Sequence, residues 1–122
     1  RHFIVEAGAA YDRAGFVILQ GCRNQHRSVE LKRIVLQPKG QGIGRACVRL
    51  LKRMAFRDLH AHRFWLDVKR LNVRAQALYA SEGFVEEGVL RESVKLADGY
   101  DSLVVMSMLS REYDARVALE LE

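Results

Sequence analysis

The spacing of apolar residues along this chain changes from one region to the next and so predicts its elements. Short β-rich apolar runs at residues 2–6, 15–22 and 29–36 predict three strands. The last run ends at Pro38, which has no N–H to donate to a neighbouring strand. Because the links between these runs are short, we expect an antiparallel meander.

A helical period replaces the strand pattern over residues 42–59. Apolar residues recur there at the spacing of one helix face, and basic residues occupy the other positions. The predicted apolar face consists of Ile43, Ala46, Cys47, Leu50, Leu51 and Met54. The predicted outer face carries Arg45, Arg49, Lys52, Arg53 and Arg57. The pattern is that of an amphipathic helix.

A second strand–helix unit follows. Residues 63–68 have the apolar character of a buried strand, which we expect to lie parallel to the strand at 29–36 because a helix joins them. Asn72 is a favourable N-cap, and Gly83 is a typical residue after a helix end. The helix between them has an apolar face of Ala75, Leu78 and Tyr79.

Two more strands are predicted at residues 84–94 and 102–109, and Asp98-Gly99 indicates a hairpin turn between them. We expect one domain over residues 1–110 and a polar tail, or a frayed helix, over 111–122. The chain starts at Arg1 without a methionine and enters a strand at once. We therefore expect an N-terminal portion to precede it.

Composition narrows the class of protein. With 122 residues, 49% of them hydrophobic, the chain is long enough for one globular core. It has no run near the ~18 apolar residues of a membrane span and no visible signal peptide. Cys22 and Cys47 lie far apart and outside any CxxC pattern, which favours a reducing cytoplasm.

The positive charge is concentrated in the middle of the chain. The formal net charge is +5, yet residues 24–65 hold ten Lys or Arg against two acids. Such a field favours a polyanionic ligand, either a phosphate-rich cofactor or nucleic acid. A solvated helix face is the plainer interpretation of the same charges. Nucleic acid is the weaker option, because no recognition motif accompanies the charge.

Three glycines separate the strand at 29–36 from the basic helix. They occupy every second position, at Gly40, Gly42 and Gly44, and Lys39 and Arg45 flank them. Glycines allow close approach of the backbone to a phosphate, and the first N–H groups of a helix point at such a ligand. We interpret the loop as a phosphate cradle, the alternative being a plain strand-to-helix turn.

Two motifs in this order resemble those of the GNAT family of N-acetyltransferases. The first is Val-Leu-x-Pro followed by Lys-Gly-Gln-Gly-Ile-Gly-Arg-Ala; the second runs from Trp-Leu-Asp-Val at 65–68 to Glu-Gly-Phe at 82–84. Glu-Glu-Gly-Val-Leu-Arg after them is common in the subgroup acting on ribosomal proteins, polyamines and small amines. The resemblance covers about residues 15–109.

This resemblance implies a mixed α/β sheet whose fourth and fifth strands, here 29–36 and 63–68, splay apart around acetyl-CoA. The cofactor would act as co-substrate, without a metal, and its acetyl group would pass directly to a primary amine. The residues implied for the pantetheine arm are Ile34, Val35 and Leu36, and those for the pyrophosphate are Lys39, Gly40, Gln41, Gly42, Ile43, Gly44 and Arg45. Asn72 matches a residue that often contacts the cofactor.

Direct transfer needs a proton donor and a route for the proton of the amine. Tyr79 matches the tyrosine that often protonates the departing thiolate, although a core aromatic is the plainer interpretation. Two residues resemble the base in different branches of the family, Glu30 and Asp67. Either one is equally consistent with a solvated strand-end carboxylate, and a bound water is an alternative to both.

The acceptor is open at this stage. A protein N-terminus, a polyamine or another small amine all fit, because the family's first strand and two helices have no counterpart before His2. We expect no membrane or specific nucleic-acid partner, while exposed sheet edges allow a homodimer. The alternatives are a non-catalytic acyl-CoA-binding module and a dinucleotide-binding redox domain. The spacing Gly-x-Gly-x-Gly departs from the fingerprint of the latter.

Overall fold

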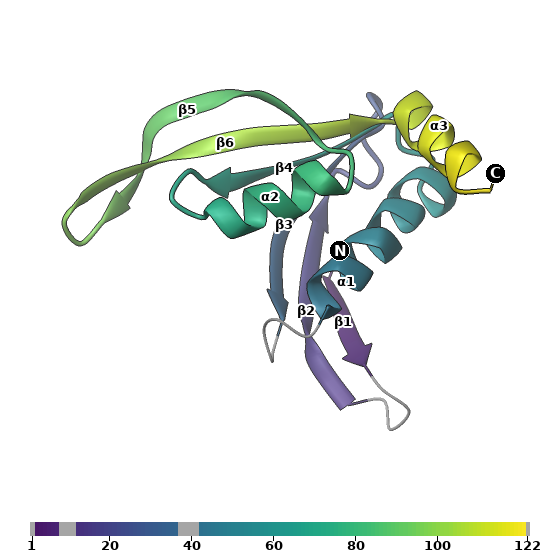
Figure 1. Cartoon of the computed structure of the whole chain (residues 1–122), viewed down its shortest axis with the longest axis horizontal. Coiled ribbons are helices and arrows are strands. Elements are labelled where there is room, and N and C mark those ends of the chain that lie inside the picture. The colour runs from purple at the N-terminus through teal and green to yellow at the C-terminus, as the bar shows by residue number, and fades with distance from the viewer. Residues whose placement is uncertain (1, 8–11, 37–41, 122) are drawn as a thin grey trace.

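The computed structural model describes residues 2–7, 12–36 and 42–121, which form one sheet and a set of helices (Figure 1). The strands are β1 (His2–Ala7), β2 (Asp12–Gln20), β3 (Ser28–Leu36), β4 (Arg63–Lys69), β5 (Val85–Leu96) and β6 (Gly99–Leu109). The helices are α1 (Ile43–Arg53), a π-helical turn η1 (Met54–Asp58), α2 (Val73–Ser81) and α3 (Ser110–Glu120).

The six strands make a mixed sheet in the order β1-β2-β3-β4-β6-β5. Strands β1, β2 and β3 pair antiparallel, which confirms the predicted meander. Strand β4 lies parallel to β3, as expected from the helix that joins them, and antiparallel to β6. The mixed α/β fold predicted from the sequence is therefore confirmed.

The parallel pair is short. Strands β3 and β4 share only the pairs Ser28–Arg63, Val29–Phe64 and Glu30–Trp65 within the described residues. Beyond them, β3 continues along β2 as far as Leu36, while β4 continues along β6 as far as Lys69. The two strands therefore separate at the centre of the sheet, and Figure 1 shows them leaving in different directions.

One face of the sheet carries the core. Alternate residues of β3 and β4 point to this inner face, and Phe64 and Leu66 are fully buried there. The helices cover it with one cluster that includes Cys47, Val48, Leu51, Ala55, Phe56, Tyr79 and Tyr113. The residues between the buried ones, among them Glu30 and Trp65, lie on the opposite, outer face and are half-buried.

The predicted apolar face of α1 is partly wrong. Leu50 is 57% exposed and Ala46 is also exposed, whereas Val48 is buried and Lys52 is only 4% exposed. The helix is thus turned so that Lys52 points inward. An amine can occupy this position because the carboxylate of Glu82 lies beside it, with Nζ and Oε1 3.2 Å apart. Sequence periodicity carries no information about that partner.

Helix α2 begins and ends as its capping residues predict. The Asn72 side chain accepts a hydrogen bond from the Ala75 N–H at 3.1 Å. At the other end Gly83 has φ 97°, and the N–H of Phe84 donates to the Tyr79 carbonyl at 3.0 Å. The Gly83 N–H donates to the Ala80 carbonyl at 3.0 Å, which completes a Schellman motif.

The segment expected to be a polar tail or a frayed helix forms the helix α3, which packs on the core. Its Tyr113 is buried and stacks on Phe56 with ring centroids 4.9 Å apart. The Leu109 N–H donates to Glu112 Oε1 at 2.8 Å, so the helix start is also bonded. Tyr113 is the one buried residue of this helix, and Val117 packs beside the core, so the apolar period is too weak for this packing to be predicted.

The β5–β6 hairpin forms as predicted, but its loop is Ala97-Asp98, one residue before the predicted Asp98-Gly99, and Leu96 pairs with Gly99. Strand β5 lies at the edge of the sheet and contains no buried residue. Irregular pairing interrupts it between Glu86 and Gly88 and between Leu90 and Val94. The far end of the hairpin extends beyond β4, whose last pair with β6 joins Lys69 to Leu103 (Figure 1).

Candidate active site

The start of α1 has the features of an anion site. Its N-cap, Gly42, has φ 74°, and neither a capping side chain nor an acidic residue of the first turn occupies this end. Among the described residues, no atom lies within 4 Å of the position that a Cβ at Gly42 would take. The first N–H groups of a helix lack internal partners and carry partial positive charge. Lys39, Gly40 and Gln41, also predicted here, lie outside the described residues.

The separation of β3 and β4 lies between this helix start and the outer face of the sheet. Ile34, Val35 and Leu36 are half-buried and pair on one side with β2, at Val17, Phe16 and Gly15. They lie beyond the last pair that β3 makes with β4. The other edge of β3 therefore faces the space into which the strands diverge. The structure brings the residues predicted for the pantetheine arm to that edge.

Tyr79 lies on the inner side, in α2. Its side chain is 7% exposed and meets Phe84 edge to face, with ring centroids 5.7 Å apart. Burial raises the pKa of the phenol, and the Cys47 thiol adds to the shift. The hydroxyl is consequently protonated at neutral pH, the state required of a proton donor. The same burial is what a purely structural core aromatic would show.

Glu30 and Asp67 lie on the outer side. Glu30 pairs with Trp65 at the last position where β3 and β4 are joined. Burial raises the pKa of Glu30, and the charge of Asp67 adds to this while Lys32 opposes it. Asp67 is exposed, two residues further along β4. The structure thus brings the two candidate bases to one face, close enough for their charges to interact.

An open cavity of about 420 Å³ lies beside Glu30 on this outer face. It is lined by Gln20, Gly21, Asn24, Ser28, Glu30, Arg63 and Trp65. Arg63 donates a hydrogen bond to Ser28 Oγ at 3.2 Å, and its guanidinium lies 5.3 Å from the centre of the Trp65 ring. The cavity therefore has a carboxylate and an indole ring in its wall, and Arg63 holds that wall together.

Glu87 also binds Arg63 and was not found from the sequence. It lies between Glu86 and Gly88, where β5 loses its regular pairing with β6. A hydrogen bond from Ser107 lowers the pKa of Glu87, burial opposes this, and the hydrogen bond and charge of Arg63 lower the pKa further. Strand alternation would have assigned this side chain wrongly, because the irregularity shifts the period by one residue.

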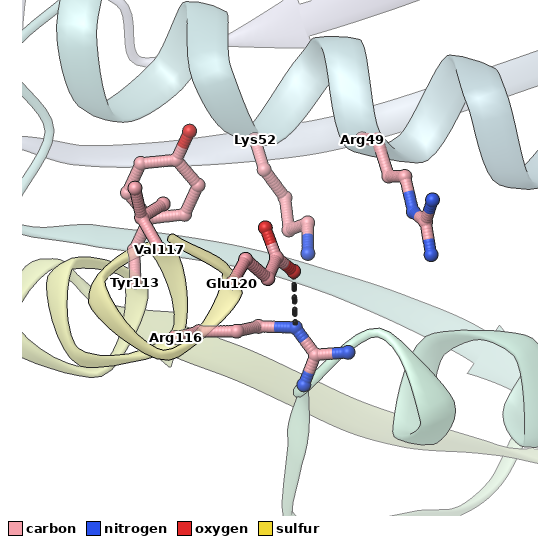
Figure 2. A pocket seen from close by; sticks show the side chains of 6 residues that line it. All are labelled: Arg49, Lys52, Tyr113, Arg116, Val117 and Glu120. Carbon is pink, nitrogen blue, oxygen red and sulfur yellow. Dashed lines mark ion pairs between the residues drawn. The ribbon is translucent and has the colours of Figure 1, made fainter. Parts of the chain in front are cut away.

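A small charged cavity of about 100 Å³ lies between α1 and α3 (Figure 2). It is lined by Arg49, Lys52, Tyr113, Arg116, Val117 and Glu120. Arg116 Nε lies 3.8 Å from Glu120 Oε1 across it. Its volume is well below the ~300 Å³ at the lower end for ligand pockets. We therefore interpret it as part of the contact between the two helices.

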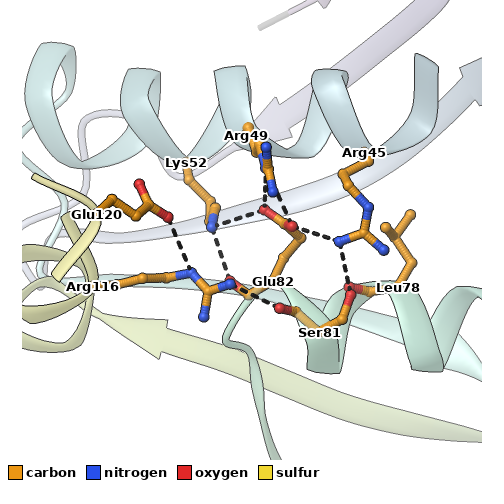
Figure 3. Close-up of polar contacts among 8 residues, drawn as sticks. All are labelled: Arg45, Arg49, Lys52, Leu78, Ser81, Glu82, Arg116 and Glu120. Carbon is orange, nitrogen blue, oxygen red and sulfur yellow. Dashed lines mark hydrogen bonds and ion pairs between the residues drawn. The ribbon is translucent and has the colours of Figure 1, made fainter. Parts of the chain in front are cut away.

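Three cations of α1 converge on Glu82, at the end of α2 (Figure 3). Arg45 lies 2.6 Å from Oε2, Arg49 3.1 Å from Oε1 and Lys52 3.2 Å from Oε1. Burial opposes ionisation of Glu82, but hydrogen bonds from these cations outweigh it and lower its pKa to about 2. Glu82 offsets one of these three positive charges, so the cluster keeps a net positive charge, and Arg45 and Arg49 remain 44% and 62% exposed.

This arrangement changes the interpretation of two predicted cofactor residues. The guanidinium of Arg45 also binds Ser81 Oγ at 2.9 Å, so it points toward α2. Asn72 uses its side-chain oxygen as the cap of α2. Both residues still lie at helix starts, where a phosphate or amide ligand would find N–H donors. Sequence reasoning missed Glu82 because nothing in the local pattern marks it as buried.

Metal and membrane features are absent from the described part of the chain. No three side chains of His, Cys, Asp or Glu come together there as a metal site. Within the same residues, no helix is long and apolar enough to cross a membrane. Cys22 and Cys47 are free thiols, as predicted.

Comparison with known proteins identifies the family. Residues 1–84 match the acetyltransferase (GNAT) family, and this chain belongs to it. It is 33% identical over 115 residues to the spermidine N(1)-acetyltransferase of Vibrio cholerae, which covers 93% of this chain and 65% of that protein. The putative ribosomal N-acetyltransferase YdaF of Bacillus subtilis is 30% identical over 113 residues, 90% of this chain and 62% of that protein.

Solved structures agree with this assignment. Mutant forms of the spermidine/spermine N-acetyltransferase SpeG from Vibrio cholerae superpose with a TM-score of 0.88 at 33% identity, covering 95% of this chain and 70% of theirs. A dodecameric structure of the same species' spermidine N-acetyltransferase gives 0.87 at 33% identity, covering 95% and 68%. The chain spans less than two thirds of the length of the two curated relatives. Because the chain belongs to this family, the alternative of a dinucleotide-binding redox domain is excluded.

The depressed pKa of Glu82 predicts an acid-sensitive contribution to stability. A carboxyl group whose pKa is lower in the folded than in the unfolded state stabilises the fold at pH values above its unfolded-state pKa. This stabilisation is lost as the pH falls toward the folded-state pKa. Replacing Glu82 by Gln should therefore destabilise the protein most at neutral pH. The difference from wild type in the free energy of unfolding should shrink by roughly 3 kcal/mol between pH 5 and 2.

Urea denaturation at a series of pH values measures this difference. The control is Asp114→Asn, which removes an exposed ion pair between Asp114 and Arg57. Its difference from wild type should stay small throughout, because exposed pairs contribute little. A Glu82→Gln difference that does not change with pH would show that the carboxylate is not ionised among its three cations.

Proposed function

We propose that this chain binds acetyl-CoA where β3 and β4 separate and transfers its acetyl group to a primary amine, with a polyamine as the favoured acceptor. The observation that carries the proposal is the end of β3–β4 pairing at Glu30 and Trp65, close in sequence to an uncapped helix start at Gly42. The first supplies a free strand edge and the second an anion site. A thioester cofactor with a pyrophosphate needs both.

The proposed cofactor contacts follow the order of the chain. The N–H groups of residues 39–45 and the charge of Lys39 hold the pyrophosphate, and Asn72 adds a polar contact. The Arg45 side chain is engaged by Glu82 and Ser81, so it contributes only its backbone N–H. The pantetheine amides bind the edge of β3 at Ile34, Val35 and Leu36, as an added strand would. The uncapped start of α1 at Gly42 and the half-buried position of the three β3 residues support this placement.

In the proposed reaction the neutral amine attacks the thioester carbon. A C–N bond forms, the C–S bond breaks, and the acetylated amine and CoA result. The amine proton passes to a carboxylate or a water, and Tyr79 donates its proton to the departing thiolate. A backbone N–H near Leu36 polarises the carbonyl oxygen. Tyr79 lies on the inner side of the sheet and the carboxylates on the outer side, so the two proton transfers would occur from opposite sides of the gap.

Of the two candidate bases, Glu30 has the stronger support. It is half-buried, it lines the outer cavity, and burial raises its pKa toward the pH at which a base works best. Asp67 is exposed and contributes its charge to the same site. We assign Glu30 as the group that takes the proton of the amine, directly or through a water, and Asp67 as a source of negative charge that attracts the acceptor.

A cationic acceptor fits the outer cavity. The Glu30 carboxylate in the wall of this cavity would attract an alkylammonium group. The Trp65 ring beside it already has the Arg63 guanidinium as its cation partner, and Arg63 is paired with Glu87. The names of the relatives from Vibrio cholerae and Escherichia coli point to spermidine in those proteins. We include the reducing cytoplasm in the proposal, because the described cysteines are free. Self-association, which the exposed edge strand β5 favours, stays a prediction.

The cofactor site is tested by placing a charge in front of α1. Gly42→Glu should weaken acetyl-CoA binding by at least tenfold in titration calorimetry, because its carboxylate would lie at the helix start and repel the pyrophosphate. Gly99→Glu is the matched control, since Gly99 also has positive φ and an open Cβ position but lies in the distal hairpin turn. Equal affinities of the two variants for acetyl-CoA would contradict the phosphate cradle. As a ligand control, NADH should not bind to wild type.

The proton donor is tested with Tyr79→Phe. The variant should bind acetyl-CoA like wild type but turn over about 10²- to 10⁴-fold more slowly, the loss typical of a removed general acid. Thiol release with a polyamine acceptor measures the rate. Tyr100→Phe is the control, because Tyr100 is an exposed tyrosine of β6. An unchanged rate would return Tyr79 to a role in packing, and binding without turnover in wild type would favour a non-catalytic acyl-CoA module.

The roles of Glu30 and Asp67 are distinguished by replacing each with the amide of the same shape. Glu30→Gln should lower kcat and remove the acidic limb of the pH–rate profile, because it removes the base itself. Asp67→Asn should chiefly raise KM for the amine, because it removes charge that attracts the acceptor. Steady-state kinetics over pH 6–9 distinguish them. The reverse pattern would exchange the two roles.

A further inference from the structure

Glu82 is a buried carboxylate that no part of the proposed chemistry uses. Its side chain is 1% exposed, and an isolated charge at such a position would be very unfavourable. The protein retains it by surrounding it with three cations from another helix. Such a cluster contributes little stability beyond what apolar packing of the same volume would give. Its geometry therefore matters more than its strength.

On one side, Glu82 binds three turns of α1. Arg45, Arg49 and Lys52 are spaced by four and then three residues, so they lie along one face of the helix over about 10 Å. Each of them contacts the same carboxylate. A slide or a rotation of α1 would break at least one of these contacts. The carboxylate thereby sets the position of the whole helix, including its start at Gly42.

On the other side, Glu82 is the C-cap of α2 and follows its last residue, Ser81. Its N–H donates to the carbonyls of Leu78 and Tyr79 at 3.0 and 3.1 Å, and its own carbonyl accepts from Lys52 Nζ at 2.9 Å. Helix α3 joins the same junction through Arg116, which donates to the Ser81 carbonyl at 2.8 Å. Figure 3 shows these side chains meeting between the three helices. The turn of α2 that carries Tyr79 is therefore bonded to α1.

We propose that Glu82 is a positioning residue, which holds the helix start at Gly42 and the hydroxyl of Tyr79 at the separation that acetyl-CoA requires. This inference rests on the proposed function. The pyrophosphate and the sulfur of the cofactor are joined by an arm of limited length. The cradle on α1 and the proton donor on α2 must therefore match that length, and displacement of a reacting group by about 1 Å is enough to lower a rate by about 10².

Two other roles would give different results. If Glu82 only stabilises the fold, its loss would lower the melting temperature and leave the rate of the folded protein unchanged. If Glu82 instead draws Arg45 away from the phosphate, its loss would release that guanidinium and tighten cofactor binding. A positioning residue should lose rate without losing affinity for the nucleotide end of the cofactor, and the loss should depend on Tyr79.

The test uses the whole chain as Glu82→Gln, kept at low temperature, with the folded fraction measured by circular dichroism. Single-turnover acetyl transfer to spermidine should slow by about tenfold to a hundredfold. The affinity for 3′,5′-ADP, which probes the nucleotide end alone, should stay within about threefold. The double variant with Tyr79→Phe should be no slower than Tyr79→Phe alone, because both changes remove the same proton transfer.

The controls separate this inference from the proposed function. Asp114→Asn breaks an ion pair between α3 and η1 that does not reach α2, and it should leave the rate within about twofold. If Glu82→Gln does not fold, Arg49→Gln carries the same measurements, because Arg49 is 62% exposed and removes only one partner. The positioning role alone would be overturned if wild type is active and Glu82→Gln transfers at the wild-type rate. It would also be overturned if the effect of Glu82→Gln adds to that of Tyr79→Phe. A wild type that neither binds acetyl-CoA nor transfers its acetyl group would overturn both proposals.

Discussion

The parting of β3 from β4 is the constraint on which the rest of this structure depends. Parallel strands normally remain paired, since unpaired backbone groups are costly to bury. Here each strand keeps a different neighbour, β2 for one and β6 for the other, so both stay in the sheet after their own pairing ends at Glu30 and Trp65. The exposed edge of β3 is thereby created without loss of the fold. A cofactor with amide groups would form hydrogen bonds with this free edge of β3.

The helices cover one face of the sheet beside this opening, and ionic contacts help to set their relative positions. Helix α1 turns Lys52 inward and Leu50 outward, against its own hydrophobic pattern, because the Glu82 carboxylate lies at the end of α2. Apolar packing of Cys47, Val48 and Leu51 sets the distance of α1 from the sheet. The ionic contacts with Glu82 fix where α1 lies along its own axis, a position that apolar packing specifies less strictly. Three of the basic residues in the middle of the chain, Arg45, Arg49 and Lys52, thus have a partner within the protein.

The candidate chemistry is distributed over both faces of the sheet. Tyr79 is buried on the helical side of the sheet, in surroundings that keep its phenol protonated. Glu30 lies on the outer side, beside an indole ring and a second carboxylate. The chain belongs to the acetyltransferase (GNAT) family and spans less than two thirds of the length of the two curated relatives.

Local sequence signals determined much of this protein. Strand periods, the Asn72 cap, the Gly83 helix end and the hairpin turn rest on interactions within a few residues, and the structure confirms them. The motifs around the glycine loop and Tyr79 were sufficient to indicate the family. Only the tertiary structure decided which side of α1 is buried, that residues 110–120 form a packed helix, and that Arg45 turns toward Glu82. These features depend on partners more than thirty residues away, and a buried ion pair has no periodic pattern by which either member could be found alone.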